Sequence, residues 1–207
     1  HRPTKYGDNL TEIRHTVAFV NEYQKPISGF EEGRIYNGYR FVYPLKYNDK
    51  YLGSVETSVS MESIMNDLKK ELSSELSFII KKSVVNNTVF EEEKDNYVQC
   101  SINNDFYHEK SISKDENEIM GTIIKEYFEK NPTQAKNNLK SGEIFNFYSF
   151  YKNNYYITTY LPLKNIVSNQ TVAYIIILNE HNDLHDFIVQ YLLFLAKIGR
   201  ASCRERV

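Results

Sequence analysis

The pattern of apolar and polar positions predicts helices and strands along most of the chain. In the first 60 residues it predicts a helix over residues 8–25, capped by Asp8, and then a hairpin with strands over residues 34–45 and 51–59. The apolar stripe of this helix consists of residues three or four positions apart, namely Leu10, Ile13, Val17 and Val20. Aromatic and β-branched residues dominate the hairpin, which favours a sheet on which the helix packs.

A second set of elements follows. A helix is predicted over residues 61–76, because Ser60 is a suitable N-cap and apolar residues recur at helical spacing after it. The remaining predicted elements are a strand over residues 77–85, a helix over residues 116–130 that ends at Asn131-Pro132, a hairpin within residues 143–165 and a strand over residues 171–180. Helix and antiparallel strands thus appear twice, which predicts an α+β fold of two sheet-and-helix modules.

Composition and charge narrow the functional classes. The chain has 207 residues, 41% of them hydrophobic, and a formal net charge of -2, so one or two compact domains are expected. The Arg/Ser/Cys/Gly-rich residues 197–207 differ from everything before them, and we interpret them as a non-native tail; a native basic tail is the alternative. Outside this tail there is no basic cluster, so no nucleic-acid partner is expected.

A short apolar run precedes the tail. Residues 187–196 are almost entirely apolar, but a helix that spans a membrane needs about 20 such residues. Because the run stops where the tail begins, we expect residues 184–196 to be the start of a transmembrane helix. A buried C-terminal helix is the alternative.

The sequence carries a family resemblance, most specific between residues 29 and 60. The segments that carry it are Gly29-Phe30-Glu31-Glu32-Gly33-Arg34, Asn37-Gly38-Tyr39-Arg40, Tyr43-Pro44-Leu45 and Gly53-Ser54-Val55-Glu56, with His1-Arg2-Pro3 and Tyr6-Gly7-Asp8 upstream. In these segments the chain resembles the double Cache family, in which two PAS-like domains stack outside the membrane ahead of a cytoplasmic output domain.

The resemblance implies a domain arrangement and a location. Residues 1–60 would be the C-terminal part of a membrane-distal Cache domain truncated at its front, residues 61–76 a connecting helix and residues 77–183 a membrane-proximal Cache domain. The whole would be the periplasmic or extracellular sensor region of a receptor in the bacterial inner membrane, homodimeric at full length. Its output domain, a histidine kinase, a GGDEF diguanylate cyclase or a chemotaxis domain, is not present, so these residues are not expected to be an enzyme.

A candidate ligand site lies in the first hairpin. Alternation along the predicted strand places Arg34, Tyr36 and Arg40 on one face and Tyr43 on the other. Because a guanidinium matches a carboxylate, Arg34 and Arg40 are candidate anchors for an organic acid or amino acid. In related Cache domains that bind amino acids, an acidic residue of the last strand meets the ligand ammonium, and Glu56 resembles that residue.

Alternatives to this site remain open at the level of sequence. Arg34 or Arg40 can instead form a structural ion pair with Glu31, Glu32 or Glu56, because a buried arginine requires a partner. Tyr36 and Tyr43 can be packing residues. At the level of function, the alternatives to a small-molecule sensor are a periplasmic module that binds a partner protein and an enzyme of unrecognised type.

Other motifs give no support for catalysis, a metal or a cofactor. The sequence has no Gly-rich phosphate loop, nucleophile elbow or HExxH motif. His181 and His185 have helical spacing for a metal, but Asp183 and Asp186 are the only further ligands nearby, and a solvated linker is favoured. Cys100 has no basic cluster near it in the sequence, so a reactive thiol is not expected there.

Overall fold

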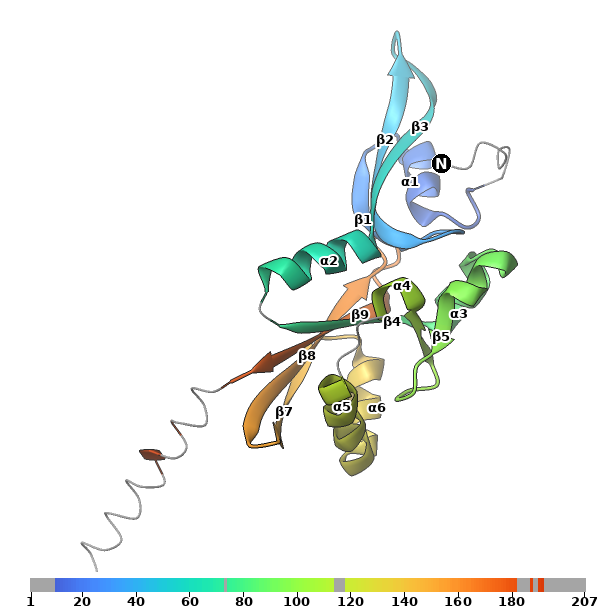
Figure 1. Cartoon of the computed structure of the whole chain (residues 1–207). Helices are drawn as coiled ribbons and strands as arrows, with labels where there is room; N and C mark the ends of the chain where they lie inside the picture. Colours follow the sequence, from blue (N-terminus) through green and yellow to red (C-terminus); the bar gives the residue numbers. More distant parts are fainter. Residues whose placement is uncertain (1–9, 73, 114–117, 182–186, 188–189, 192–207) are drawn as a thin grey trace, which may run out of the picture.

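The first sheet has three antiparallel strands with a helix against one face. The computed structural model describes residues 10–72, 74–113 and 118–181, together with residues 187, 190 and 191. Its first elements are α1 (His15–Tyr23), β1 (Ile27–Glu32), β2 (Asn37–Tyr47) and β3 (Lys50–Ser60). The strands lie in the order β1-β2-β3, and α1 packs beside them (Figure 1). We call these elements the N-terminal module.

The second sheet has six antiparallel strands in the order β5-β6-β4-β9-β8-β7. Helix α2 (Met61–Glu71) precedes the first strand of this sheet. The strands of the sheet and the helices between them are, in chain order, β4 (Glu75–Lys81), α3 (Lys82–Thr88), the 3-10 helix η1 (Glu91–Asn96), β5 (Tyr97–Gln99), β6 (Phe106–Glu109), α4 (Lys110–Ser113), α5 (Glu118–Lys130), α6 (Pro132–Ser141), β7 (Phe145–Tyr151), β8 (Asn154–Lys164) and β9 (Thr171–Glu180). We call β4 to β9, with their helices, the C-terminal module. The predicted α+β class with antiparallel sheets is confirmed.

Both faces of the six-stranded sheet are buried. On one face, α5 and α6 cover a core rich in aromatic residues, including Tyr160 and Tyr174. On the other face, α2 contributes Met61 and Met65 to a second core (Figure 1). The central strands β4 and β9 are accordingly buried along almost their whole length, as their continuous apolar runs require.

The two modules share the second core. Phe30 of β1 is 4% exposed and lies among the side chains of α2, β4 and β9. Its ring centroid is 6.2 Å from that of Phe78, and its backbone bridges to Asn165 in the turn after β8. The N-terminal sheet is therefore packed directly on the C-terminal module.

Tight turns set the register of both long hairpins. In the turn after β2, Asn48 and Asp49 have φ of 45° and 59°, and in the turn after β7, Lys152 and Asn153 have φ of 48° and 67°. Two residues with positive φ match the twist of the flanking strands, and Asn and Asp tolerate this conformation. Both hairpins were predicted from the sequence.

Three helix predictions need correction. The helix predicted over residues 61–76 ends at Glu71, because Leu76 pairs with Ile177 in the sheet and is buried there. Asn131-Pro132 ends α5 but also begins α6, which the sequence analysis missed, since proline suits the first turn of a helix. The first helix begins at His15, and Asp8, its predicted cap, lies outside the described residues.

The second predicted module is also larger than expected. The strand predicted over residues 77–85 ends at Lys81, and Val85 is buried in α3 instead. Strands β4, β5 and β6 join the three predicted C-terminal strands in a single sheet.

Among the described residues, no helix is long and apolar enough to cross a membrane. The transmembrane segment expected at residues 184–196 lies outside the described residues, apart from residues 187, 190 and 191. The expected tail at residues 197–207 lies wholly outside them.

Two glycine substitutions test the packing. A Cβ on Gly38 would lie 2.2 Å from the Val59 carbonyl oxygen, so Gly38→Ala must displace β3 and is expected to lower the free energy of unfolding by about 1–3 kcal/mol. At Gly121, inside α5, a Cβ meets no atom within 4 Å, so Gly121→Ala is expected to raise it by about 0.5–1 kcal/mol. Urea unfolding measures both, and equal effects would contradict the described hairpin contact.

Candidate functional site

The α1-facing side of the N-terminal sheet carries a cluster of charged residues. Strand register places Gly29 opposite Arg40, Glu31 opposite Gly38 and Val42 opposite Glu56. Paired residues of antiparallel strands point to the same face, so Glu31, Arg40 and Glu56 lie on one side. This is the side that α1 covers, which brings Arg14 into the cluster.

These residues form a network of alternating charges. Arg14 Nε lies 2.8 Å from Glu31 Oε2, Arg14 Nη2 also contacts Glu56 Oε2, and Arg40 Nη1 lies 3.0 Å from Glu56 Oε1. The Glu31 and Arg40 side chains are 2% and 4% exposed, whereas that of Glu56 is 23% exposed. Two arginines and two glutamates sum to zero charge, and Glu56 is the member that solvent reaches most easily.

The start of α1 holds one end of this network. The Thr16 backbone N–H donates to Glu31 Oε1 at 3.0 Å, and its hydroxyl donates to Oε2 at 2.6 Å. Burial disfavours the charged form of Arg14, but Glu31 and Glu56 outweigh burial and raise the Arg14 pKa. Arg14 was not predicted as a site residue, although it lies four residues after Leu10 and three before Val17, on the apolar stripe of the helix.

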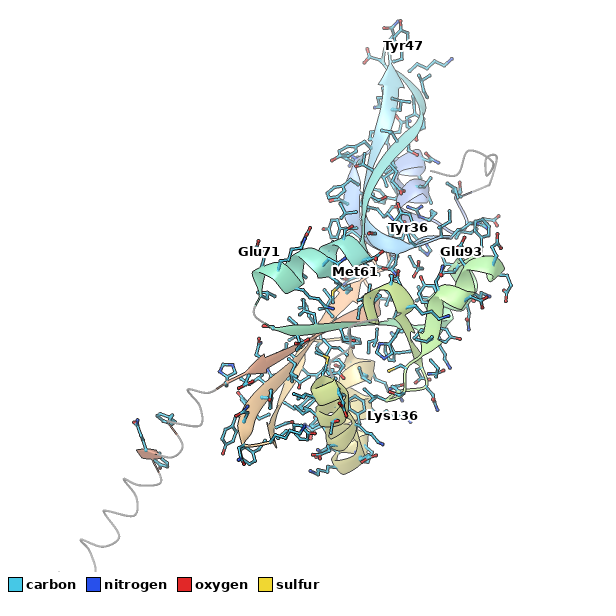
Figure 2. All side chains as sticks on the ribbon, in the orientation of Figure 1. Tyr36, Tyr47, Met61, Glu71, Glu93 and Lys136 are labelled. Atoms are coloured by element: carbon cyan, nitrogen blue, oxygen red, sulfur yellow. The ribbon has the colours of Figure 1, made fainter. Side chains whose placement is uncertain are left out.

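Arg40 has further contacts with Tyr36. Its Nη2 donates to the Tyr36 carbonyl oxygen at 2.5 Å, and its guanidinium carbon lies 4.6 Å from the centre of the Tyr36 ring. The Tyr36 hydroxyl and Ser58 Oγ are 2.8 Å apart, and Tyr36 lies near the base of the hairpin, far from Tyr47 at its tip (Figure 2). Arg40 Nε is buried and has no hydrogen-bond partner among the described residues.

The structure does not bring all five predicted site residues together. Tyr36, Arg40 and Glu56 meet in the network. Strand β2 begins at Asn37, so Arg34 lies before it, and its guanidinium packs 4.6 Å from the centre of the Phe90 ring. The predicted shared face of Arg34 and Arg40 is therefore wrong. Tyr43 is 48% exposed on the opposite face of the sheet, as the alternation predicted.

A second polar cluster joins the two modules. Glu32 follows Glu31 on β1 and so points to the other face, where it accepts a hydrogen bond from the Tyr97 hydroxyl of β5 at 3.2 Å. Asn37 Nδ2 donates to Glu109 Oε2 of β6 at 2.6 Å and to the Tyr97 hydroxyl at 3.5 Å. From the sequence, Glu32 was predicted only as a possible arginine partner, because strands distant in sequence supply Tyr97 and Glu109.

This junction cluster favours protonated carboxyl groups. Burial, followed by the charge of Glu109, raises the pKa of Glu32 to about 8, although Tyr97, the Gly33 N–H and Arg40 oppose the shift. Burial also raises the pKa of Glu109, with a further contribution from Glu62 of α2. The Glu32 carboxyl is thus largely protonated at neutral pH. In this protonated form it can donate a hydrogen bond as well as accept one.

A polar cleft opens beside both clusters. Its volume is about 290 Å³, and it lies between the two modules, where His15, Glu31 and Glu32 face Asn87 and Asn165. Its walls come from α1, β1, α3 and the turn between β8 and β9. A relative movement of the modules would therefore change its width. No group of three or more His, Cys, Asp or Glu residues suited to a metal ion occurs in the described parts of the chain.

The junction makes stability depend on pH. Glu32 has a pKa of about 8 in the folded chain and an ordinary value of 4.5. The folded chain therefore keeps this proton to higher pH, and stability falls as the pH rises from about 4.5 to 8, by up to about 1.4 kcal/mol per pH unit. Glu32→Gln is expected to remove most of this fall in urea unfolding measured from pH 5 to 8.

The control for this measurement is Glu75→Gln, which changes an exposed glutamate. It should leave the pH profile unchanged. A Glu32→Gln profile that coincides with the parent profile would contradict the role of Glu32.

A family comparison matches nearly the whole chain. Residues 1–183 match the family described as the double sensory domain of two-component sensor kinase, which is a double Cache family. No curated protein matches the chain.

Similar solved structures include a chemotaxis protein and a chemoreceptor domain, at low identity. A structure titled methyl-accepting chemotaxis protein X is 8% identical with a TM-score of 0.40, over 86% of this chain and 58% of that one. The ligand-binding domain of the Pseudomonas fluorescens chemoreceptor CtaA is 13% identical. Its complex with L-isoleucine has a TM-score of 0.37 over 91% of this chain and 64% of that chain, and its complex with L-leucine 0.36 over 89% and 64%. The chain thus spans less than two thirds of each of these solved chains.

Proposed function

The chain belongs to the double sensory domain family of two-component sensor kinases, and from this we propose that it is the extracytoplasmic sensor region of a bacterial membrane receptor. It binds a small organic acid or amino acid. The N-terminal module is the membrane-distal Cache domain, helix α2 connects the modules, and the C-terminal module is the membrane-proximal domain. The full receptor is a homodimer in the inner membrane whose output domain lies outside these residues.

The observation that carries this proposal is the unused donor of Arg40. Its Nε is buried without a hydrogen-bond partner among the described residues, and an unpaired buried donor costs about 1–3 kcal/mol. A ligand carboxylate placed against the guanidinium would supply the absent acceptor with the planar geometry that arginine favours.

The charges of the network suit a zwitterion. A ligand carboxylate at Arg40 adds one negative charge, and a ligand ammonium at Glu56 adds one positive charge. The total therefore stays at zero, and no uncompensated charge is buried. Glu56 is the reachable member of the network, so it can turn from Arg40 toward the ligand with little rearrangement.

Strand β1 connects the proposed ligand site to the C-terminal module. When a ligand competes for Glu56, Arg14 loses one of its two carboxylate contacts, and its pairing with Glu31 on β1 adjusts. The neighbouring residue Glu32 contacts Tyr97 in the second module. Ligand binding would thus shift the population between two arrangements of the modules, provided the ligand binds one arrangement more tightly.

Substitution of Arg40 and Glu56 tests the site. A thermal-shift screen of organic acids and amino acids is expected to give a stabilising ligand. Arg40→Lys, which keeps the charge but loses the planar fork, and Glu56→Gln are each expected to weaken its binding at least about tenfold in isothermal titration calorimetry.

The control variant is Asp67→Asn, which breaks an ion pair with Lys70 whose side chains are 75% and 76% exposed. It should leave the affinity unchanged. Unchanged affinity in both Arg40→Lys and Glu56→Gln, with a ligand in hand, would refute this assignment of the site.

A second candidate function is a module that binds a partner protein. It is favoured by the bare face of the hairpin, where the side chains opposite α1 are 40–48% exposed: Tyr39, Tyr43, Leu45, Val55 and Val59. Exposed apolar patches of this kind are typical of interaction surfaces. Failure of every compound in the screen, together with capture of a periplasmic binding protein that Tyr43→Ser abolishes, would favour this function.

A further inference from the structure

A small cavity lies inside the C-terminal module, apart from the charged network. It is enclosed by β4, β6, β8, β9, α5 and α6, and its volume is about 40 Å³. Its apolar lining includes Ile79, Met120, Ile124, Leu139 and Ile176. Since one water molecule needs about 10–15 Å³ measured in this way, the cavity fits only molecules of a few atoms. Ser101 lines the cavity and is exposed, so the cavity reaches the surface beside this residue.

A thiol and an imidazole meet at this cavity. Strand β6 pairs His108 with Val98, and the Cys100 backbone N–H donates to the Phe106 carbonyl oxygen at 3.1 Å just beyond β5. Cys100 and His108 are therefore diagonal neighbours on one face of the sheet, within reach of each other. Both side chains line the cavity and are 2% and 7% exposed.

The surroundings of Cys100 lower the pKa of its thiol. Burial raises the pKa of the thiol, but the hydrogen bond and charge of His108, with the backbone N–H groups of Ile102 and Asn103, outweigh burial and lower it. From the sequence, no basic cluster was found near Cys100, and His108 was therefore not included. His108 is distant in sequence, and sheet pairing brings it to Cys100.

The Tyr160 hydroxyl is a third polar group at the cavity, in addition to Cys100 and His108. Tyr160 lines the cavity and is 1% exposed. Burial and then the charge of Cys100 raise the pKa of Tyr160, so its hydroxyl stays protonated. A protonated hydroxyl that lines the same cavity as Cys100 and His108 can donate a hydrogen bond to a small molecule there.

We propose that Cys100 is a modification site for hydrogen peroxide, held in this cavity by Tyr160 and His108. The thiol proton first passes to His108. The Cys100 sulfur then attacks one peroxide oxygen, the O–O bond breaks, and the sulfenic acid Cys100–SOH forms. Sulfur loses two electrons to the peroxide, and the second oxygen leaves as hydroxide, accepts the proton from His108 and departs as water. Tyr160 donates a hydrogen bond to this leaving oxygen.

The proposal concerns an activity separate from ligand binding in the N-terminal module. A sulfenic acid adds a polar oxygen to the core that packs α5 and α6 on the sheet. The cavity has room for this oxygen but excludes larger oxidants and bulky alkylating reagents. Oxidation of Cys100 would thereby be a second signal, besides ligand binding, that acts on the C-terminal module.

The reaction is tested on the whole chain in a Cys203→Ser background, which leaves Cys100 as the single thiol. The protein is exposed to hydrogen peroxide, and the reaction is stopped in urea that contains a sulfenic-acid trap. Mass spectrometry then counts trapped chains. The folded chain is expected to react at least about tenfold faster than the same chain unfolded in urea. In the folded chain the pKa of the thiol is lowered, and Tyr160 donates a hydrogen bond to the oxygen that leaves the peroxide.

Two tyrosine variants separate positioning from packing. Tyr160→Phe is expected to slow the reaction several-fold, because it removes the hydrogen-bond donor, while leaving the melting temperature almost unchanged, because it keeps the ring in the core. Tyr156→Phe is the matched control, because Tyr156 lies on the same face of β8 in the same core but does not line the cavity. Equal rates in folded and unfolded chains, or equal rates in the two variants, would overturn the proposal.

Discussion

Successive side chains of a strand point to opposite faces of its sheet, and the architecture of this sensor region depends on that constraint at β1. Glu31 points toward α1, where it pairs with Arg14, and Glu32 points toward the C-terminal module, where it meets Tyr97. Buried carboxyl groups must be paired or protonated, and β1 contains one of each kind. The charged network and the junction between the modules are thus both attached to one strand, β1.

The C-terminal module supplies a firm support for this segment. Both faces of its sheet are covered, and Phe30 inserts into the core between α2 and the sheet. A change in the position of β1 therefore acts on a packed interface and not on a flexible linker. The same covered sheet encloses the small cavity at Cys100 on its opposite face, so the two proposed inputs reach one sheet from two sides.

Local sequence signals predicted the parts of the fold that depend on local chemistry. Both hairpin turns, the Ser60 N-cap and the last strand follow from residue type and spacing, and Ser60 Oγ does accept the Ser63 N–H at 3.2 Å. Alternation also placed Arg40 and Val42 on one face and Tyr43 on the other. Helices α3 and α6 were missed, because short valine-rich and proline-containing segments suit more than one structure.

The remaining site residues depend on contacts between distant parts of the chain. Arg14 reaches Glu56 across 42 residues, and Asn37 reaches Glu109 across 72 residues. Nothing near these residues in the sequence indicates their partners. Arg34 was misplaced for a related reason, since the Gly33 N–H bonds the Tyr36 carbonyl at 3.1 Å in a bend that delays the start of β2.

The central claim is that the Arg40 guanidinium anchors the ligand. Proton–nitrogen NMR of arginine side chains observes the Arg40 Nε–H group directly, with Arg40→Lys used to assign its signal. On titration with a ligand from the screen, this signal is expected to shift downfield and to exchange more slowly with water, because Nε–H gains an acceptor. An unchanged Arg40 signal at saturating ligand, with shifts confined to backbone groups elsewhere, would contradict the claim.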